Sequence, residues 1–177
     1  ILNRLGIDII GWPTYLEPLT VTTWHRGSRG FMAYRDFRLT VDDEVVAAAT
    51  SRWLFLDLAR KRVVKVPKAS TEAYGVENPR ATEMDLDAWS PPDMPGKTSP
   101  FTVTTRLSDF DPNGHVNNAV YFDYLETALA ADRNRKDTPR QFLIQYQKEI
   151  PRSVAAVTVG VGDGDTLRPF AVWGENG

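Results

Sequence analysis

One helical pattern stands among many strand-like segments, and it restricts the possible folds more than any other feature of the chain. Apolar residues recur every three to four positions within residues 115–131, at Val116, Val120, Tyr124, Leu125 and Leu129. This spacing predicts a helix with one apolar stripe that other parts of the chain must cover. The strand-like segments around it are the candidates to cover it.

Those surrounding segments have the composition of β-strands. They cover residues 7–10, 18–24, 31–39, 45–58, 101–107, 141–150, 155–161 and 169–173. They are rich in β-branched and aromatic residues and are bounded by turn formers, as is typical of antiparallel strands. We therefore expect an α+β fold in which antiparallel sheet covers a single long helix.

The chain divides into two β-rich regions. Residues 68–100 lack apolar periodicity and contain several prolines, which predicts a linker that crosses the surface. The linker separates an N-terminal region, residues 1–67, from a C-terminal region, residues 101–177. Residues 7–13 faintly resemble residues 146–151, which suggests duplication, although the first region has no matching helix. Missing segments, including the natural N-terminus, are the simplest explanation.

Composition excludes several classes of function. The formal net charge is only −2, which argues against a nucleic-acid partner, and the chain has no cysteine. A disulfide framework, a thiolate zinc site and a cysteine nucleophile are therefore excluded. No apolar run is long enough to predict a membrane span, and a cytoplasmic protein without metal or other cofactor is expected.

Chemically useful side chains are concentrated in one short segment, Asp109-Phe-Asp-Pro-Asn-Gly-His-Val-Asn-Asn118. It contains two carboxylates, three carboxamides and His115, one of the two histidines of the chain. It stands at a predicted strand-to-helix junction, where unpaired backbone N–H groups could polarise a carbonyl oxygen. The same residues are also ordinary turn formers and helix caps. Both interpretations remain open on these residues alone.

This segment, followed by Tyr121, resembles the active-site signature of the plant and bacterial fatty acyl-ACP (acyl carrier protein) thioesterases. Further resemblances occur in the family's order and cover most of the chain: Thr22-Thr-Trp24, Arg35-Asp-Phe37, Thr50-Ser-x-Trp53 continuing to Asp57, and Tyr146-x-x-Glu149. The resemblance implies two tandem hotdog domains, each a long helix wrapped by antiparallel sheet. The first, apparently truncated, would bind the acyl chain, and the second would be catalytic.

Carried over by position, the catalytic set implied by the resemblance is Asp111, Asn113, His115 and Glu149. Some family members have a cysteine directly after the glutamate, where this chain has Ile150, so water is the expected nucleophile. Either Glu149 or His115 would act as general base. Asn113 would position or polarise the thioester. Asp111 would either orient its neighbours or attack the carbonyl through a transient anhydride.

Other residues have weaker assignments. Asn117, Asn118, Trp12 and Trp53 are the candidates for substrate binding, whereas His25 lacks an acidic neighbour in the sequence and is interpreted as structural. The basic residues form two clusters: Arg60, Lys61, Arg62, Lys65 and Lys68; and Arg133, Arg135, Lys136 and Arg140. Either cluster is a solvated surface or a site that steers acidic ACP.

The resemblance implies hydrolysis of acyl-ACP to free fatty acid and carrier protein, which ends fatty acid elongation. The alternatives are an acyl-CoA or aroyl-CoA thioesterase of the hotdog fold, a hydratase on that fold, and a non-catalytic hotdog protein that binds acyl chains or carrier proteins. A plant source would place the protein in the plastid. Hotdog units usually pair, so a homodimer is also compatible with this assignment.

Overall fold

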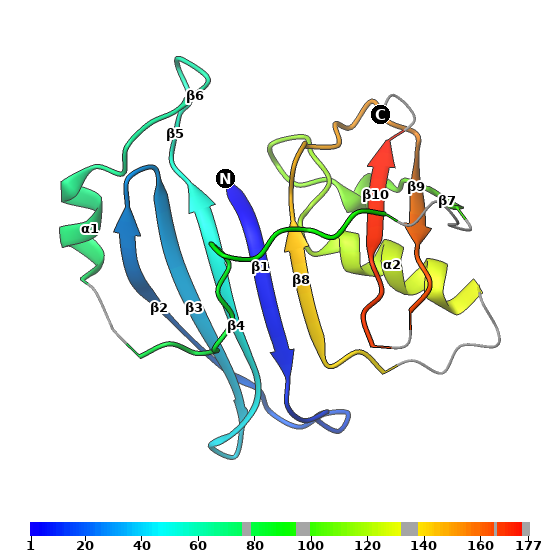
Figure 1. Cartoon of the computed structure of the whole chain (residues 1–177), viewed down its shortest axis with the longest axis horizontal. Coiled ribbons are helices and arrows are strands. Elements are labelled where there is room, and N and C mark those ends of the chain that lie inside the picture. Colours follow the sequence, from blue (N-terminus) through cyan, green and yellow to red (C-terminus); the bar gives the residue numbers. More distant parts are fainter. Residues whose placement is uncertain (76–78, 95–99, 132–137, 165, 175–177) are drawn as a thin grey trace. The chain divides into compact units, whose positions relative to one another are not determined.

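A computed structural model describes residues 1–75, 79–94, 100–131, 138–164 and 166–174. The chain forms two compact units. The first unit comprises residues 1–90 and 138–147, and the second comprises residues 91–137 and 148–177. Each unit contains its own antiparallel sheet (Figure 1).

The first unit is built on a five-stranded antiparallel sheet with the order β2-β3-β4-β1-β8. The bounds of these strands are Leu2–Ile9 (β1), Thr20–Arg29 (β2), Met32–Val41 (β3), Glu44–Leu54 (β4) and Gln141–Gln145 (β8). A two-residue turn joins β3 to β4, and its residues Asp42 and Asp43 both have positive φ, at 47° and 67°. Such a turn matches the twist of paired strands. Each strand expected in this part of the chain overlaps an observed one, but β1 begins earlier than residue 7 and β8 ends well before residue 150.

Two smaller elements follow β4 in the first unit. Strands β5 (Leu56–Asp57) and β6 (Arg62–Val63) form a short hairpin, and helix α1 (Lys68–Tyr74) comes next. The first basic cluster lies on this hairpin and at the start of α1. Three residues of the second cluster, Arg133, Arg135 and Lys136, lie outside the described residues.

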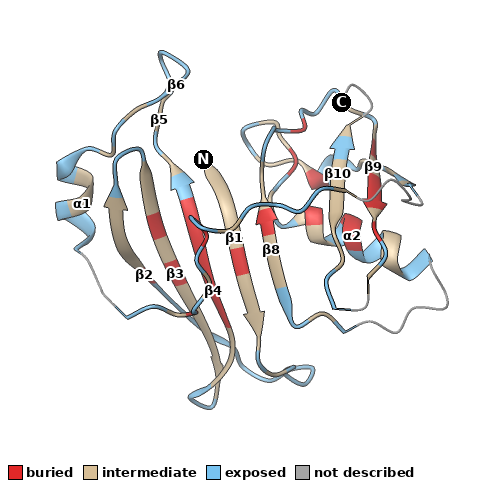
Figure 2. Ribbon diagram, in the orientation of Figure 1, coloured by how far each residue is buried: buried red, intermediate tan, exposed pale blue. Residues whose placement is uncertain are grey.

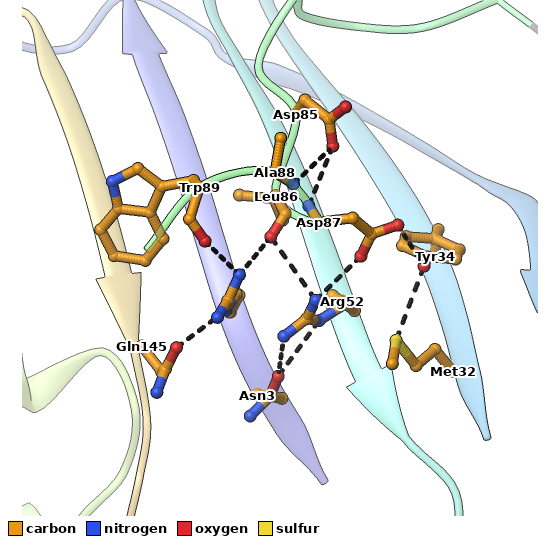
Figure 3. A network of polar contacts seen from close by, with 11 residues as sticks. Asn3, Met32, Tyr34, Arg52, Asp85, Leu86, Asp87, Ala88, Trp89 and Gln145 are labelled. Atoms are coloured by element: carbon orange, nitrogen blue, oxygen red, sulfur yellow. Dashed lines mark hydrogen bonds and ion pairs between the residues drawn. The ribbon is translucent and has the colours of Figure 1, made fainter. Parts of the chain in front are cut away.

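The segment after α1 is held against the sheet rather than crossing the surface freely. Arg4 donates hydrogen bonds to the carbonyl oxygens of Leu86 and Trp89, and Arg52 donates to Asp87 at 2.8 Å (Figure 3). Leu86 is buried. The described part of the predicted linker thus contains a helix and a packed segment, and its Pro95 and Gly96 lie outside the described residues. Hydrogen bonds from side chains to backbone carbonyl groups do not produce a periodic pattern of apolar residues. The sequence of this segment therefore predicts a linker on the surface.

The second unit packs one helix on a three-stranded antiparallel sheet with the order β10-β9-β7. The strands are β7 (Phe101–Thr104), β9 (Ala156–Val161) and β10 (Phe170–Gly174), and a short 3-10 helix, η1, covers Leu107–Asp109. Helix α2 (Val120–Ala131) contacts all three strands. The core forms where Tyr124 and Leu125 of α2 meet Val157 and Val159 of β9, all of them buried (Figure 2). A helix packed on antiparallel sheet is confirmed here.

Two differences from the prediction bear on the site. Helix α2 begins at Val120 rather than near His115, because His115 and Val116 form β-bridges with Pro151 and Phe110, which require extended backbone. Strand β8 was expected in the C-terminal region, but it pairs with β1 and so belongs to the first unit. Pairing between strands far apart in sequence has no local signal. No described helix is long and apolar enough to span a membrane.

Candidate active site

The polar segment forms a loop whose two ends are held together by Asp109. The Asp109 carboxylate is buried, and it accepts hydrogen bonds from the backbone amide of Arg106 at 2.8 Å and from the Tyr124 hydroxyl at 2.8 Å. The Asp109 carbonyl oxygen accepts the backbone amide of Asn117, also at 2.8 Å. The loop from residue 109 to residue 117 is therefore fastened at both ends and tied to helix α2.

Within the loop, Asp111 organises a tight turn. Its carboxylate accepts hydrogen bonds from the Asn113 backbone amide at 2.9 Å, the Asn113 side-chain amide at 3.2 Å and the His115 backbone amide at 3.3 Å. Gly114 has a φ of +80°, which a residue with a side chain adopts only with strain. The turn explains the local sequence Asp-Pro-Asn-Gly, and it places Asn113 and His115 beside Asp111.

A strand-like pairing brings Glu149 to this loop. His115 forms a β-bridge with Pro151, and the amides of Val116 and Arg152 donate to the carbonyl oxygens of Ile150 and Gly114, each at 2.9 Å. The His115 Nε2 and Glu149 Oε2 atoms are 3.2 Å apart. The side chains are 36% and 54% exposed, respectively, so water can reach the pair. Local backbone bonds thus join two residues that are distant in sequence.

The charges around the loop favour an ionised carboxylate next to His115. Partial burial tends to raise the pKa of Asp111, but hydrogen bonds from Asn113 and from the His115 backbone outweigh it and hold this pKa below its usual value. Asp111 is therefore charged at neutral pH. The donors to the Asp111 carboxylate all come from the loop itself, so this carboxylate is suited to orient Asn113 and His115.

Several of the backbone amides expected to polarise a substrate carbonyl are already used. Those of His115, Val116 and Asn117 bond to other parts of the chain, and that of Ala119 bonds to the Asn117 side chain at 3.0 Å. These four amides are therefore occupied, because this stretch pairs with neighbouring segments before the helix begins. The Asn113 side-chain amide has two hydrogens and donates one to Asp111, which leaves a second for a substrate oxygen.

The four predicted substrate-binding residues are divided between the two units: Asn117 and Asn118 lie in the second, and Trp12 and Trp53 lie in the first. Asn117 and Asn118 lie between His115 and helix α2, and the Asn117 side chain is used as a cap for the turn before that helix. In the first unit, Trp53 lines a hollow together with Phe55 and Tyr74. Trp12 is 56% exposed in the segment after β1 and is not among the described residues that line this hollow.

The second histidine, His25, lines the same hollow in a different setting. Its Nε2 atom is 3.3 Å from the Ser28 hydroxyl, and its ring contacts Tyr74. Burial and the positive charge of Arg35 lower the pKa of His25, although a backbone hydrogen bond with Tyr34 opposes them. Within the described ranges, no carboxylate bonds to His25. Nor do the described residues contain a cluster of His, Asp or Glu that could hold a metal ion.

Sequence reasoning assigned no role to two tyrosines and an aspartate beside the site. Asp109 belongs to the polar segment, but its burial was not foreseen, and Tyr124 was placed only in the apolar stripe. Tyr121, known from the resemblance alone, is buried and contacts Ile150. The only available signal was the spacing of these tyrosines, which puts both on one face of helix α2.

Comparison with known proteins gives matches along most of the chain. Residues 1–74 match a family model described as the acyl-ACP thioesterase N-terminal domain, and residues 95–158 match the corresponding C-terminal domain. The chloroplastic oleoyl-acyl carrier protein thioesterase of Coriandrum sativum is 27% identical over 82% of this chain and 42% of its own length. The chain thus spans about two fifths of the length of that relative.

Solved structures support the fold. An acyl-ACP thioesterase from Bacteroides thetaiotaomicron matches all of this chain and 71% of its own, with a TM-score of 0.83 and 20% identity. The 12:0-ACP thioesterase from Umbellularia californica matches 99% of this chain and 70% of its own, with a TM-score of 0.82 and 19% identity. A protein described as having the hot dog fold, from Alicyclobacillus acidocaldarius, matches 99% of this chain and 74% of its own, with a TM-score of 0.51 and 13% identity. The predicted α+β hotdog fold is confirmed.

Proposed function

Because this chain belongs to the acyl-ACP thioesterase family, we propose that it hydrolyses fatty acyl-ACP to free fatty acid and carrier protein, the reaction that ends fatty acid elongation. The observation that carries the proposal is the 3.2 Å contact between His115 and Glu149 beside the Asp111–Asn113 turn. A histidine paired with a carboxylate and open to water is suited to remove a proton from a nucleophilic water.

The reaction proceeds through attack of water on the thioester carbonyl carbon. The His115–Glu149 pair takes one proton from the water as the new C–O bond forms. The resulting tetrahedral intermediate collapses with cleavage of the C–S bond, and the pair returns the proton to the departing sulfur. General base catalysis of this kind contributes about two to four orders of magnitude in rate.

Asn113 and Asp111 have supporting roles in this mechanism. The free hydrogen of the Asn113 amide donates to the carbonyl oxygen as negative charge develops there. Asp111 holds both Asn113 and the backbone of His115, so it orients the two groups. Ile150, which follows Glu149, is buried and cannot act as a nucleophile. Water is therefore the nucleophile in the proposed mechanism.

The first unit is proposed to bind the acyl chain. Its hollow is lined by Trp53, Phe55 and Tyr74, whose rings offer apolar surface to a hydrocarbon chain. The carrier protein would be the macromolecular partner, and Asn118 would contact the substrate near the catalytic loop. The expected compartment is the cytoplasm, or the plastid if the source is a plant.

The test is a comparison of substrates with one acyl chain on three carriers: ACP, CoA and N-acetylcysteamine. We expect the highest kcat/KM with acyl-ACP and release of fatty acid from it. Preference for acyl-CoA would instead identify an acyl-CoA thioesterase, the leading alternative. Absence of hydrolysis with all three, in a chain shown to be folded by circular dichroism, would refute the proposed function.

A further inference from the structure

We infer that Tyr121 and Tyr124 are positioning residues: from one face of helix α2 they hold the two separate segments that bring His115 and Glu149 together. This inference rests on the proposed function, because it explains how that site keeps its geometry. Tyr124 acts on the site through Asp109, and Tyr121 acts through the segment that contains Ile150.

Tyr124 holds the loop that carries His115. Its side chain is 1% exposed, and its hydroxyl donates to the Asp109 carboxylate at 2.8 Å. Burial by itself would raise the pKa of Asp109, but hydrogen bonds from the Arg106 backbone and from Tyr124 outweigh burial and hold this pKa below its usual value. The acceptor therefore stays charged. Hydrogen bonds to charged acceptors are among the stronger ones in proteins. Asp109 closes the loop through Asn117, so this one bond fixes the whole loop to helix α2.

Tyr121 holds the segment that carries Glu149. It is buried in the first turn of α2, where its phenol lies against the backbone of Ile150, the residue after Glu149. Burial and the nearby negative charge of Glu149 raise the pKa of Tyr121, whereas the Ile150 backbone opposes the rise. The phenol is therefore a neutral, buried contact beside the Glu149 segment.

The two contacts share one rigid support. Tyr121 and Tyr124 are three residues apart on α2, and their ring centroids are 6.5 Å apart. Residues three apart on a helix occupy the same face. Helix α2 packs on all three strands of its sheet, so it cannot shift without disturbing the core of the second unit. Backbone pairing between residues 114–116 and 150–152 brings His115 and Glu149 together. The two tyrosines on one face of α2 support the two segments that take part in this pairing.

The test uses substitutions that remove only one oxygen atom. In Tyr124→Phe and in Tyr121→Phe we expect kcat to fall about 10- to 100-fold with KM changed less than about threefold, because small misplacement of reacting groups reduces chemistry more than binding. The double variant should lose less than the product of the two single losses, since both act on one alignment. Thermal unfolding verifies that each variant is folded.

Thr50→Val is the matched control. Thr50 lies in the first unit and donates its hydroxyl to the buried carboxylate of Asp36 at 2.7 Å, so the substitution removes the same type of bond elsewhere. We expect its kcat to equal that of the wild type. If Thr50→Val lost as much kcat as the tyrosine variants, general destabilisation would explain all three losses, and the inference would be overturned.

An NMR measurement separates this inference from the proposed function. The chain has two histidines, so the imidazole resonances of His25 serve as an internal reference for those of His115. We expect the His115 resonances to move in both tyrosine variants while the His25 resonances stay in place. Unchanged His115 resonances, or wild-type kcat in both variants, would overturn the inference. If the wild type hydrolyses no thioester, the proposed function fails, and the resonances still decide whether the tyrosines position His115.

Discussion

Each of the two compact units contains one histidine, and the two differ in their partners. His115 in the second unit contacts the Glu149 carboxylate at 3.2 Å. His25 in the first unit faces the Ser28 hydroxyl and the cation Arg35. The cation and burial lower the pKa of His25, which disfavours the imidazolium that a general base must form. A carboxylate partner, rather than the histidine itself, marks the candidate site.

The largest expected effect separates these two histidines directly. His115→Ala should lower kcat by about two to four orders of magnitude, because the general base is lost. His25→Ala should leave kcat within about threefold and alter mainly KM for long acyl chains, because His25 lines the proposed acyl hollow. Steady-state kinetics with acyl-ACP measures both. A fall in kcat for His25→Ala as large as that for His115→Ala would reverse the comparison.

The next effect concerns the carboxylate that supports His115 from within its loop. Asp111→Asn should lower kcat by about 10- to 100-fold, since asparagine keeps one oxygen for the two backbone amides but turns an NH2 group, which is a donor, toward the Asn113 side-chain amide.

A single turnover of the wild type in H₂¹⁸O, followed by mass spectrometry, tests the role of Asp111. We expect ¹⁸O in the fatty acid and none in Asp111. Label in the Asp111 carboxylate would show that it attacks the carbonyl through an anhydride.

A third prediction concerns acid stability of the unit that contains His115. The pKa of Asp109 is lower in the folded chain than in the unfolded chain, where an aspartate titrates near pH 3.9. Its contribution to the free energy of unfolding is therefore full above that pH and is lost as the pH falls through the folded pKa. Asp109→Asn should unfold with a weaker dependence on pH in this range, as measured by urea titrations. Parallel pH dependence in the variant and the wild type would contradict this assignment.

The smallest effect is expected at the basic hairpin, which belongs to the first unit and not to the unit that contains His115. Lys61, Arg62 and Lys65 form no ion pair with any other described residue. Replacing all three by alanine should lower kcat/KM for acyl-ACP a few-fold at low salt and should not change hydrolysis of the uncharged N-acetylcysteamine thioester. The loss should disappear at high salt. An equal loss with both substrates would exclude carrier steering.

The sequence predicts the strands and the presence of the helix, because both have local periods. It does not predict where the helix begins, since the bridges that keep His115 and Val116 extended join them to Pro151 and Phe110, and such pairing has no local pattern. The role of Glu149 in the site is equally hard to predict from the local sequence. Beside Lys148 it resembles an ordinary charged strand edge, and only the family resemblance predicted its role. The bridge between His115 and Pro151 explains how it reaches the site.

The roles of Asp109 and Tyr124 were not predictable for a related reason. A tyrosine in an apolar stripe and an aspartate before a turn are each ordinary, and the 2.8 Å bond between them depends on how the loop packs on the helix. For Trp12 and Trp53 the sequence did suggest a role, and the structure separates the two. Both were selected as large aromatic residues, yet only Trp53 lines the hollow, because its place on β4 is fixed by pairing with β1 and β3.

The central claim is that His115 and Glu149 together activate the attacking water. The most direct measurement is kcat for acyl-ACP hydrolysis by Glu149→Gln, alone and combined with His115→Ala. We predict a fall of about two to four orders of magnitude in the single variant and little further loss in the double variant, because the two residues act as one unit. Wild-type kcat in a folded Glu149→Gln variant would contradict the claim.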